Sequence, residues 1–201
     1  MKFSYCPVCG TKLVKRLMDD EGVAPYCDTC HRPRFDLFKV AVIGLVENEC
    51  GEVALIRQRS FSSCYESLVS GFVSEGEHAE DALRREIAEE LGIAIESMRF
   101  EGTHWFEAKG ILMMGFFARA PKQPFRLTRE VDGARWVPLA QAVHLVHPRP
   151  AFSRTLIERR LAERGDAAPD NLVYRAGRRV FPGPMHGNRT RLHPVAAPLA
   201  S

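Results

Sequence analysis

The stretch GFVSEGEHAEDALRREIAEELGI, residues 71–93, organises the rest of the chain. It predicts a loop followed by one helix, which carries Glu86, Glu89 and Glu90 at positions i, i+3 and i+4 on one face. Like charges at this spacing repel, which costs roughly a few tenths of a kcal/mol per i,i+4 pair in an isolated helix. A divalent cation is the natural compensation, because hard cations such as Mg²⁺ bind carboxylate oxygens.

A second face of the predicted helix is apolar. Leu83, Ile87 and Leu91 recur every four residues and predict a buried stripe beside the glutamates. Gly92 follows directly and is typical of a residue that ends a helix. The alternative is a solvated, salt-bridged surface helix, which is what runs of charged residues usually form.

The fixed residues of this stretch follow the spacing G-x5-E-x7-R-E-U-x-E-E-x-G-U, in which U is apolar. The positions are occupied by Gly71, Glu77, Arg85, Glu86, Ile87, Glu89, Glu90, Gly92 and Ile93. The pattern resembles the Nudix box at every defining position, and it is far more specific than a lone three-glycine motif. The resemblance implies an α/β fold, the α/β/α sandwich, and a Mg²⁺- or Mn²⁺-dependent hydrolase that cleaves a nucleoside diphosphate linked to another moiety.

The resemblance also implies roles for the box residues. Metal ions held by Glu86, Glu89 and Glu90 would screen the charge of a pyrophosphate, lower the pKa of a bound water and orient it toward phosphorus. One carboxylate then accepts the proton as general base, and Glu89 is a candidate. We expect Arg85 to anchor the loop by pairing with Glu77 or another box carboxylate instead of contacting substrate.

One glutamate outside the box belongs to the same hypothesis. Glu130 lies six residues before Trp136 and resembles the extra glutamate that these Nudix enzymes bring to the metal site. It is the second candidate for the general base, beside Glu89. A lone glutamate in a charged loop is more often only solvated, and that alternative stays open.

Length and composition limit the other possibilities. The chain has 201 residues with 45% apolar content, enough for one well-packed domain and a small appendage. No apolar segment suits a signal peptide or a membrane span, so we expect a cytoplasmic protein without a membrane partner. The formal net charge of +3 resides in residues 166–201, where five arginines and two aspartates give 5 − 2 = +3. The charge is therefore no argument that the folded body binds nucleic acid.

The N-terminal segment contains two C-x2-C pairs, Cys6 with Cys9 and Cys27 with Cys30, separated by seventeen residues. Four thiolates in this arrangement can surround a tetrahedral structural Zn²⁺. About thirty residues cannot bury enough surface to fold alone, so metal binding would supply the folding energy. Two disulfides or a redox C-x-x-C are the alternatives, but disulfides need an oxidising compartment. His31 directly after Cys30 is interpreted as a structural residue that tolerates a positive φ.

The remaining chain is predicted to build the main domain. Arg57 ends a predicted strand and is interpreted either as a phosphate ligand or as a solvated charge. Residues 65–69 lead into the glutamate helix. The other elements expected from hydrophobic periodicity are strands within 35–48, at 53–57, 98–105 and 111–120, and a helix at 151–164. The predicted organisation is a zinc ribbon at 1–34, a Nudix domain at 35–165 and a disordered tail containing Pro and Arg at 166–201.

A narrower resemblance concerns the combination of ribbon and box, which is found in the NADH pyrophosphatase (NAD⁺ diphosphatase) family. That family carries Ser-Gln-Pro-Trp-Pro-Phe-Pro after its box, followed by Leu-Met. Aligning Leu112 and Met113 on the Leu-Met places residues 103–109, THWFEAK, over the motif, with Phe106 on its Trp. The prolines, the Gln and the second aromatic residue are absent.

This resemblance implies hydrolysis of NAD(H) to AMP and nicotinamide mononucleotide, with Phe106 and its neighbour Trp105 stacking on a flat base. It also implies an NAD-capped RNA 5′ end as a larger substrate, and a homodimer. ADP-ribose, FAD or another nucleotide is the alternative substrate. A third hypothesis is a binding module, in which the ribbon recognises nucleic acid or protein and the Nudix domain is inert.

Overall fold

The computed structural model describes residues 3–18, 22–35, 37–58, 62 and 64–165. The predicted tail at residues 166–201 lies outside the described residues. Among the helices in the described ranges, none combines the length and the hydropathy that crossing a bilayer requires.

The N-terminal unit is a small antiparallel sheet. Its strands are β1 (Val14–Met18), β2 (Gly22–Cys27) and β3 (Arg32–Pro33), in the order β1-β2-β3. The register places Val14 opposite Tyr26 and Cys27 opposite Arg32, so the sheet brings the second C-x2-C pair to the end of β2. An antiparallel pair of strands, β1 and β2, therefore lies between Cys9 and the second cysteine pair.

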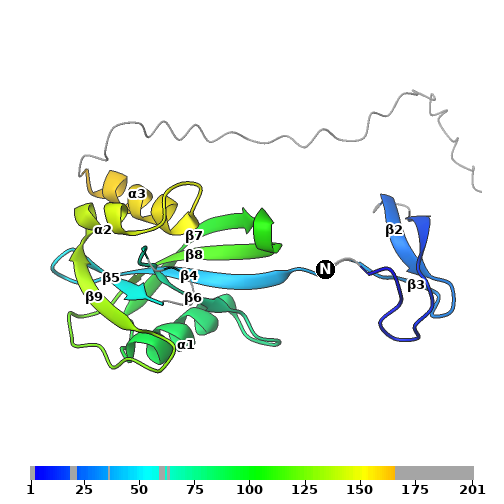
Figure 1. Cartoon of the computed structure of the whole chain (residues 1–201), viewed down its shortest axis with the longest axis horizontal. Helices are drawn as coiled ribbons and strands as arrows, with labels where there is room; N and C mark the ends of the chain where they lie inside the picture. The colour runs from blue at the N-terminus through cyan, green and yellow to red at the C-terminus, as the bar shows by residue number, and fades with distance from the viewer. Residues whose placement is uncertain (1–2, 19–21, 36, 59–61, 63, 166–201) are drawn as a thin grey trace, which may run out of the picture. The chain divides into compact units, whose positions relative to one another are not determined.

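The main domain is built on one mixed sheet with the strand order β7-β8-β4-β5-β9, and β6 also pairs with β4 (Figure 1). The strands are β4 (Lys39–Glu47), β5 (Glu52–Arg57), β6 (Val69–Phe72), β7 (Ser97–Phe106), β8 (Ile111–Arg119) and β9 (Gly133–Pro138). Strand β4 pairs in parallel with β8 over its whole length. Its other edge is shared, since β6 pairs with Ala41–Gly44 and β5 pairs at Glu47.

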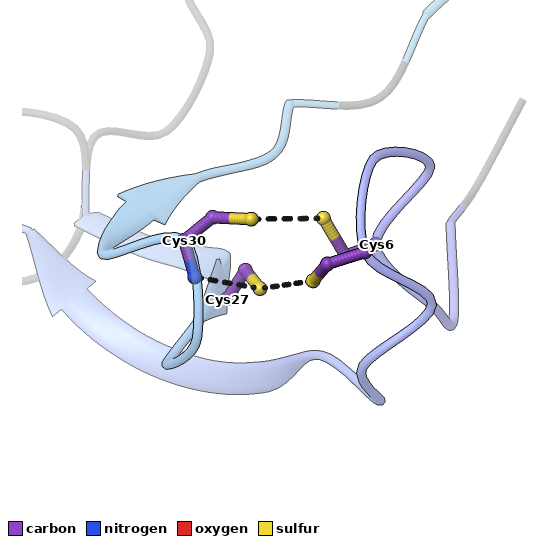
Figure 2. A group of neighbouring side chains, drawn as sticks. Cys6, Cys27 and Cys30 are labelled. Atoms are coloured by element: carbon purple, nitrogen blue, oxygen red, sulfur yellow. Dashed lines mark hydrogen bonds between the residues drawn. The ribbon is translucent and has the colours of Figure 1, made fainter.

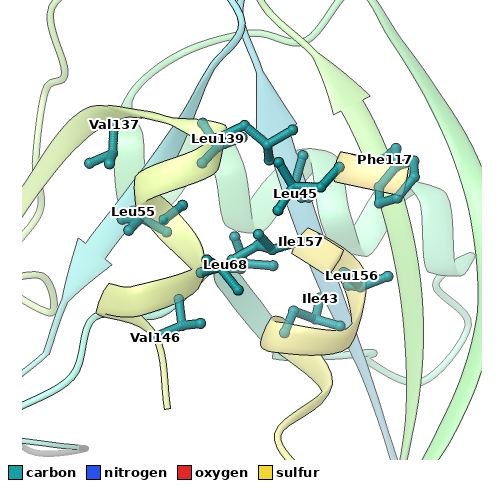
Figure 3. Packing of buried hydrophobic residues seen from close by; sticks show 14 of the residues in the cluster. Ile43, Leu45, Leu55, Leu68, Phe117, Val137, Leu139, Val146, Leu156 and Ile157 are labelled. Carbon is teal, nitrogen blue, oxygen red and sulfur yellow. The ribbon is translucent and has the colours of Figure 1, made fainter. Parts of the chain in front are cut away.

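Helices cover both faces of this sheet (Figure 1). Helix α1 (Ala79–Leu91) covers one face, and α2 (Leu139–Leu145) and α3 (Phe152–Arg164) cover the other. Alternate side chains of β4 serve the two cores, with Val42 toward α1 and Ile43 toward α2 and α3 (Figure 3). The predicted α/β/α sandwich is confirmed.

The α1 layer lies close to the sheet because β4 has a glycine at its centre. A Cβ atom at Gly44 would lie 2.7 Å from Cδ1 of Leu83. Leu83, Ile87 and Leu91 are fully buried, so the predicted apolar stripe of the glutamate helix is confirmed.

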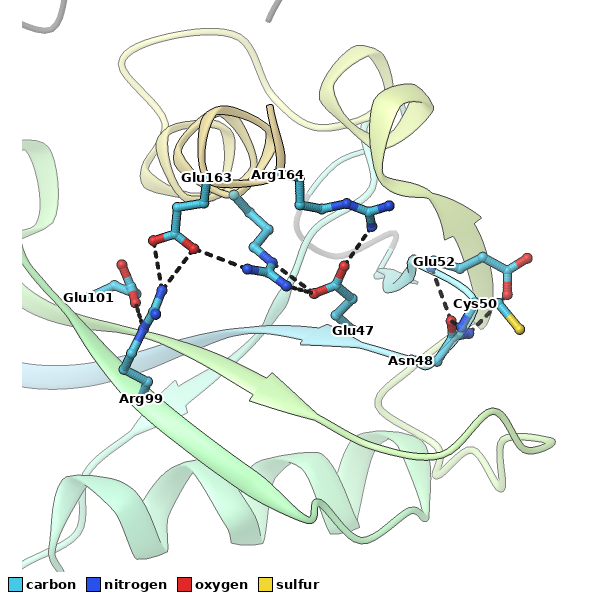
Figure 4. Close-up of polar contacts among 9 residues, drawn as sticks. Glu47, Asn48, Cys50, Glu52, Arg99, Glu101, Glu163 and Arg164 are labelled. Carbon is cyan, nitrogen blue, oxygen red and sulfur yellow. Dashed lines mark hydrogen bonds and ion pairs between the residues drawn. The ribbon is translucent and has the colours of Figure 1, made fainter. Parts of the chain in front are cut away.

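Helix α3 is fastened by charge as well as by apolar packing (Figure 4). The buried carboxylate of Glu47 on β4 accepts hydrogen bonds from Arg160 and Arg164, at 2.8 Å each. Arg99 on β7 bonds Glu163 of the helix at 2.7 Å. Removing one partner of a buried ion pair is costly, so these contacts hold the last turns of α3 against the sheet.

Strand β9 was not predicted. Strand β9 pairs with β5 in antiparallel register, with Arg135 opposite Leu55. It begins at Gly133 and ends at Pro138, two residues that are poor strand formers, and its partner strand lies far away in the sequence. Tertiary pairing, and not a local pattern, therefore creates this edge of the sheet.

Candidate active site

The loop before α1 depends on a glycine. Gly71 lies in β6 opposite Val42, and a Cβ atom at Gly71 would lie 1.9 Å from Cδ of Glu86. Only a residue without a side chain leaves room for this carboxylate against the strand. Gly92 ends the helix at φ 66°, and its N–H donates to the carbonyl of Ala88 at 3.0 Å.

The three helix carboxylates differ sharply in exposure. The side chain of Glu89 is 58% exposed, whereas Glu86 is largely covered and Glu90 is only 4% exposed. This acidic face of α1 therefore has one solvent-exposed carboxylate, Glu89, and two that are largely buried, Glu86 and Glu90.

Arg85 is the cationic centre of this face. Its guanidinium forms a two-pronged ion pair with Glu77, at 2.9 and 3.0 Å, and bonds Glu86 at 2.8 Å and Glu89 at 3.1 Å. It also donates to the carbonyl of Phe72 at 3.1 Å. Because protein groups occupy its donors, Arg85 ties the loop to the helix.

Glu77 completes this anchor. Hydrogen bonding by Arg85, supported by the backbone N–H of Ser74 at 2.9 Å, lowers the pKa of Glu77 to about 2. Glu77 therefore stays ionised and keeps the loop attached to Arg85 over the whole physiological range.

Glu90 is held differently. Its Oε1 accepts a hydrogen bond from Nε2 of Gln58 at 2.7 Å, and no group in the described part of the chain donates to its buried Oε2. Burial, followed by the charge of Glu86, raises the pKa of Glu90 to about 7. Burial also raises the pKa of Glu86, against the opposing effect of Arg85.

Glu130 joins the same electrostatic environment from another segment. It is exposed in the chain before β9, and its charge contributes to the raised pKa of both Glu86 and Glu90. The fold therefore brings this glutamate near the helix carboxylates, although it lies forty residues beyond Glu90 in the sequence.

The two predicted stacking residues lie on opposite faces of the sheet. Trp105 is paired with Leu112 on the α1 face and is 48% exposed, with its ring centroid 5.8 Å from that of Phe38. Phe106 pairs with Ile111 and points to the other face, where the ammonium of Lys109 lies 5.8 Å from its ring centroid. The two rings therefore do not form one continuous stacking surface. Trp105 lies on the α1 face of the sheet, the face that also carries the helix carboxylates.

Arg57 is also placed away from the helix carboxylates. It shares the face of Leu55, toward α2 and α3, and its guanidinium bonds the buried Glu66 at 3.0 Å. Arg135 holds the same carboxylate at 3.0 Å. In the structure Arg57 therefore belongs to an ion-pair cluster, and its contact with a phosphate stays a prediction.

The four N-terminal cysteines converge, with all their Sγ atoms within 4.8 Å of one another (Figure 2). The Sγ atoms of Cys9 and Cys27 are 3.4 Å apart, those of Cys6 and Cys30 are 3.9 Å apart, and none forms a disulfide. Burial acts to raise the pKa of Cys6, but hydrogen bonds from the backbone of Cys9 and Val8 lower it to about 6.

The turn that closes this cluster uses an unusual backbone conformation. His31, after the last cysteine, has φ 52°, as its interpretation as a structural residue requires. The N–H of Cys30 donates to Sγ of Cys27 at 3.3 Å, which fixes the second pair. The predicted grouping of the two C-x2-C pairs is confirmed.

Comparison with known proteins places this geometry in a family. The family model of the NUDIX domain matches residues 37–159. The chain belongs to the Nudix family. This Nudix chain is 31% identical over 164 residues to the NAD-capped RNA hydrolase NudC of Pseudomonas syringae pv. tomato, covering 81% of the chain and 57% of the relative. For the same enzyme of Pseudomonas fluorescens the identity is 30%, covering 82% and 59%.

The Nudix chain thus spans less than two thirds of the length of these relatives. Among solved structures, a NUDIX hydrolase from Nitrosomonas europaea superposes with a TM-score of 0.65 and 21% identity. The superposition covers 83% of this chain and 95% of that one, and it establishes a shared fold.

One residue of the Nudix site escaped sequence reasoning. Gln58 follows β5, and its side chain reaches the helix carboxylates from the strand. The sequence signal that could have identified Gln58 is the alternation of side chains along a strand. Ala54 and Ile56 belong to the core under α1, and Gln58 lies on the same face two residues further along. The neighbouring Arg57 was predicted as a phosphate ligand instead, because it carries a charge.

The pKa of Glu90 predicts a distinctive pH dependence. A carboxyl whose folded pKa is about 7, against about 4.3 in the unfolded chain, binds more protons when folded between these values. Its contribution to stability is therefore full below about pH 4.3 and is lost as the pH rises to about 7. In buffer free of Mg²⁺ and Mn²⁺, the melting temperature of wild type minus that of Glu90→Gln should fall across this range. A difference that stays flat or rises would contradict this placement of Glu90.

Proposed function

We propose that the chain is a metal-dependent Nudix pyrophosphohydrolase that cleaves a nucleoside diphosphate linked to another moiety. The observation that carries the proposal is the buried Glu90, whose Oε2 has no donor in the described part of the chain, beside a Glu86 carboxylate held against Gly71. A protein does not bury such an oxygen without cost, and a ligand at this face would offset it.

The donor set fits Mg²⁺ or Mn²⁺. Glu86, Glu89 and Glu90 offer carboxylate oxygens from one helix, and Glu130 adds another from the chain before β9. Burial and mutual repulsion raise the pKa of Glu86 and Glu90, and a cation would relieve both effects. When bound, the metal supplies charge screening for the pyrophosphate and a water of lowered pKa.

The chain's own residues supply the remaining functions. Glu89, the most exposed of the three helix carboxylates, accepts the proton of the attacking water, and Glu130 is the alternative base. Arg85 and Glu77 hold the loop and helix in one geometry, so the carboxylates meet the substrate already oriented.

The cysteine cluster fits a structural Zn²⁺. Thiolate sulfur is a preferred zinc ligand, and four sulfurs from two paired turns suit tetrahedral coordination by Cys6, Cys9, Cys27 and Cys30. Zinc would supply the folding energy of the ribbon at residues 1–34. The proposal places the protein in the reducing cytoplasm, where thiolates remain available to the metal.

Within this activity, NAD(H) is the preferred substrate, with AMP and nicotinamide mononucleotide as products. The relatives named NAD-capped RNA hydrolase support an NAD-type pyrophosphate and an RNA 5′ end as a larger substrate. Exposed Trp105 offers a ring on the α1 face for stacking on a base, worth about 1–3 kcal/mol in nucleic-acid examples. A homodimer is part of the same proposal.

Two other functions are less well supported. ADP-ribose, FAD or another nucleotide is the second candidate, because the segment aligned with the family's substrate motif lacks its prolines and its second aromatic residue. An inert domain beside a ribbon that binds nucleic acid or protein is the third. The complete set of Glu86, Glu89 and Glu90 argues against it, because an inert domain has no use for a repulsive acidic face.

Removing one carboxylate tests the metal-dependent activity. Glu89→Gln should lower turnover with Mg²⁺ by several orders of magnitude, because a neutral amide replaces both a metal ligand and the candidate base. Its melting temperature should stay near that of wild type, since the side chain is exposed. Glu80→Gln, an exposed change on the same helix, is the matched control. Turnover of Glu89→Gln equal to wild type would refute the site.

Metal analysis tests the ribbon. One equivalent of zinc should copurify with the wild type, and Cys27→Ser should lose most of it because a buried thiolate ligand is removed. Cys50→Ser, an exposed cysteine outside the cluster, should retain the zinc. A wild-type protein without zinc and with disulfides among the four cysteines would overturn the assignment.

A substrate panel of NADH, ADP-ribose and FAD, with products identified by mass, tests the preferred substrate. NADH should be cleaved fastest, and Trp105→Ala should lower kcat/KM for NADH by about 5- to 150-fold, the loss of one stacked base. Phe106→Ala, on the opposite face, is the comparison for the predicted stacking residue. Faster cleavage of ADP-ribose or FAD would remove the NAD(H) assignment and leave the broader activity standing.

A further inference from the structure

The end of β5 delivers a neutral amide to the acidic face of α1. Ala54 and Ile56 of β5 lie in the core beneath α1, and Gln58 continues this alternation to the edge of the helix carboxylates. Arg57, one residue earlier, faces the other layer and pairs with Glu66. The strand therefore directs its charged residue away from the site and its uncharged one into it.

The hydrogen bond from Gln58 makes the two carboxylate oxygens of Glu90 differ. Oε1 accepts the Gln58 hydrogen bond at 2.7 Å, and the buried Oε2 has no donor among the described residues. A neutral donor holds Oε1 in place without bringing a positive charge to the carboxylate. Glu86 and Glu89, in contrast, already contact the cationic Arg85. Glu90 is therefore held by the neutral Gln58, whereas Glu86 and Glu89 are paired with a cation.

We infer that Gln58 is a positioning residue that presents Oε2 of Glu90 to the divalent cation. This inference rests on the proposed metal-dependent function and assigns a residue that no box position contains. Hydrogen-bonded partners of metal ligands typically set metal affinity, and their loss costs about 10- to 100-fold. Since the other carboxylates remain in place, we expect a loss near the lower end of that range.

Direct titration with Mn²⁺, followed by electron paramagnetic resonance without substrate, tests the inference on the full chain. Gln58→Met removes the donor at similar length and should weaken Mn²⁺ binding by about 10-fold. Gln58→Ala is a second variant in case methionine does not fit. Gln141→Met, the same change at an exposed position on α2, is the control and should bind Mn²⁺ as wild type does. Melting temperatures verify that each protein is folded.

A double-mutant cycle with Glu90→Gln separates positioning from a general structural effect. If Gln58 acts through Glu90, then Gln58→Met should add little further loss of Mn²⁺ affinity in the Glu90→Gln background. Unchanged Mn²⁺ affinity in folded Gln58→Met, or additive losses in the cycle, would overturn the inference while leaving the proposed function intact. A wild type that binds no Mn²⁺ would overturn both.

Discussion

The fold must compensate the electrostatic repulsion among the carboxylates on one face of α1. Arg85 balances part of it through Glu86 and Glu89, and it is itself held by Glu77. Glu90 lies deeper, where burial and the neighbouring charge raise its pKa to about 7. Arg85 thus stabilises the outer part of the face, and a bound cation would stabilise the ionised form of the inner carboxylates.

This arrangement depends on the sheet, because two strands, β6 and β5, pair with the same edge of β4. Strand β6 pairs with the first half of β4 and brings Gly71 beneath Glu86, where a Cβ atom would lie 1.9 Å from Cδ of the carboxylate. Strand β5 pairs at Glu47 and delivers Gln58 to Glu90. Two segments that differ in sequence position thereby reach successive turns of α1, while buried ion pairs hold α3 against the far face of the sheet.

Local spacing in the sequence was sufficient to predict the glutamate helix and the grouping of cysteines, because these depend on residues close together in the chain. The α/β/α layers were implied by the resemblance of residues 71–93 to the Nudix box. Local spacing was insufficient where strand pairing decides. Strand β9, for example, exists only through its pairing with β5. Strand alternation was an available signal for the face of Gln58, but its contact with Glu90 depends on the tertiary fold.

The central claim is that the carboxylate face of α1 binds a divalent cation. Crystals of the full chain soaked in Mn²⁺, with diffraction data recorded at the manganese absorption edge, test it most directly. We expect an anomalous difference peak at coordination distance from Oε2 of Glu90, which has no donor among the described residues, and from the Glu86 carboxylate, whose charge raises the pKa of Glu90. A map with no manganese peak at this face would contradict it.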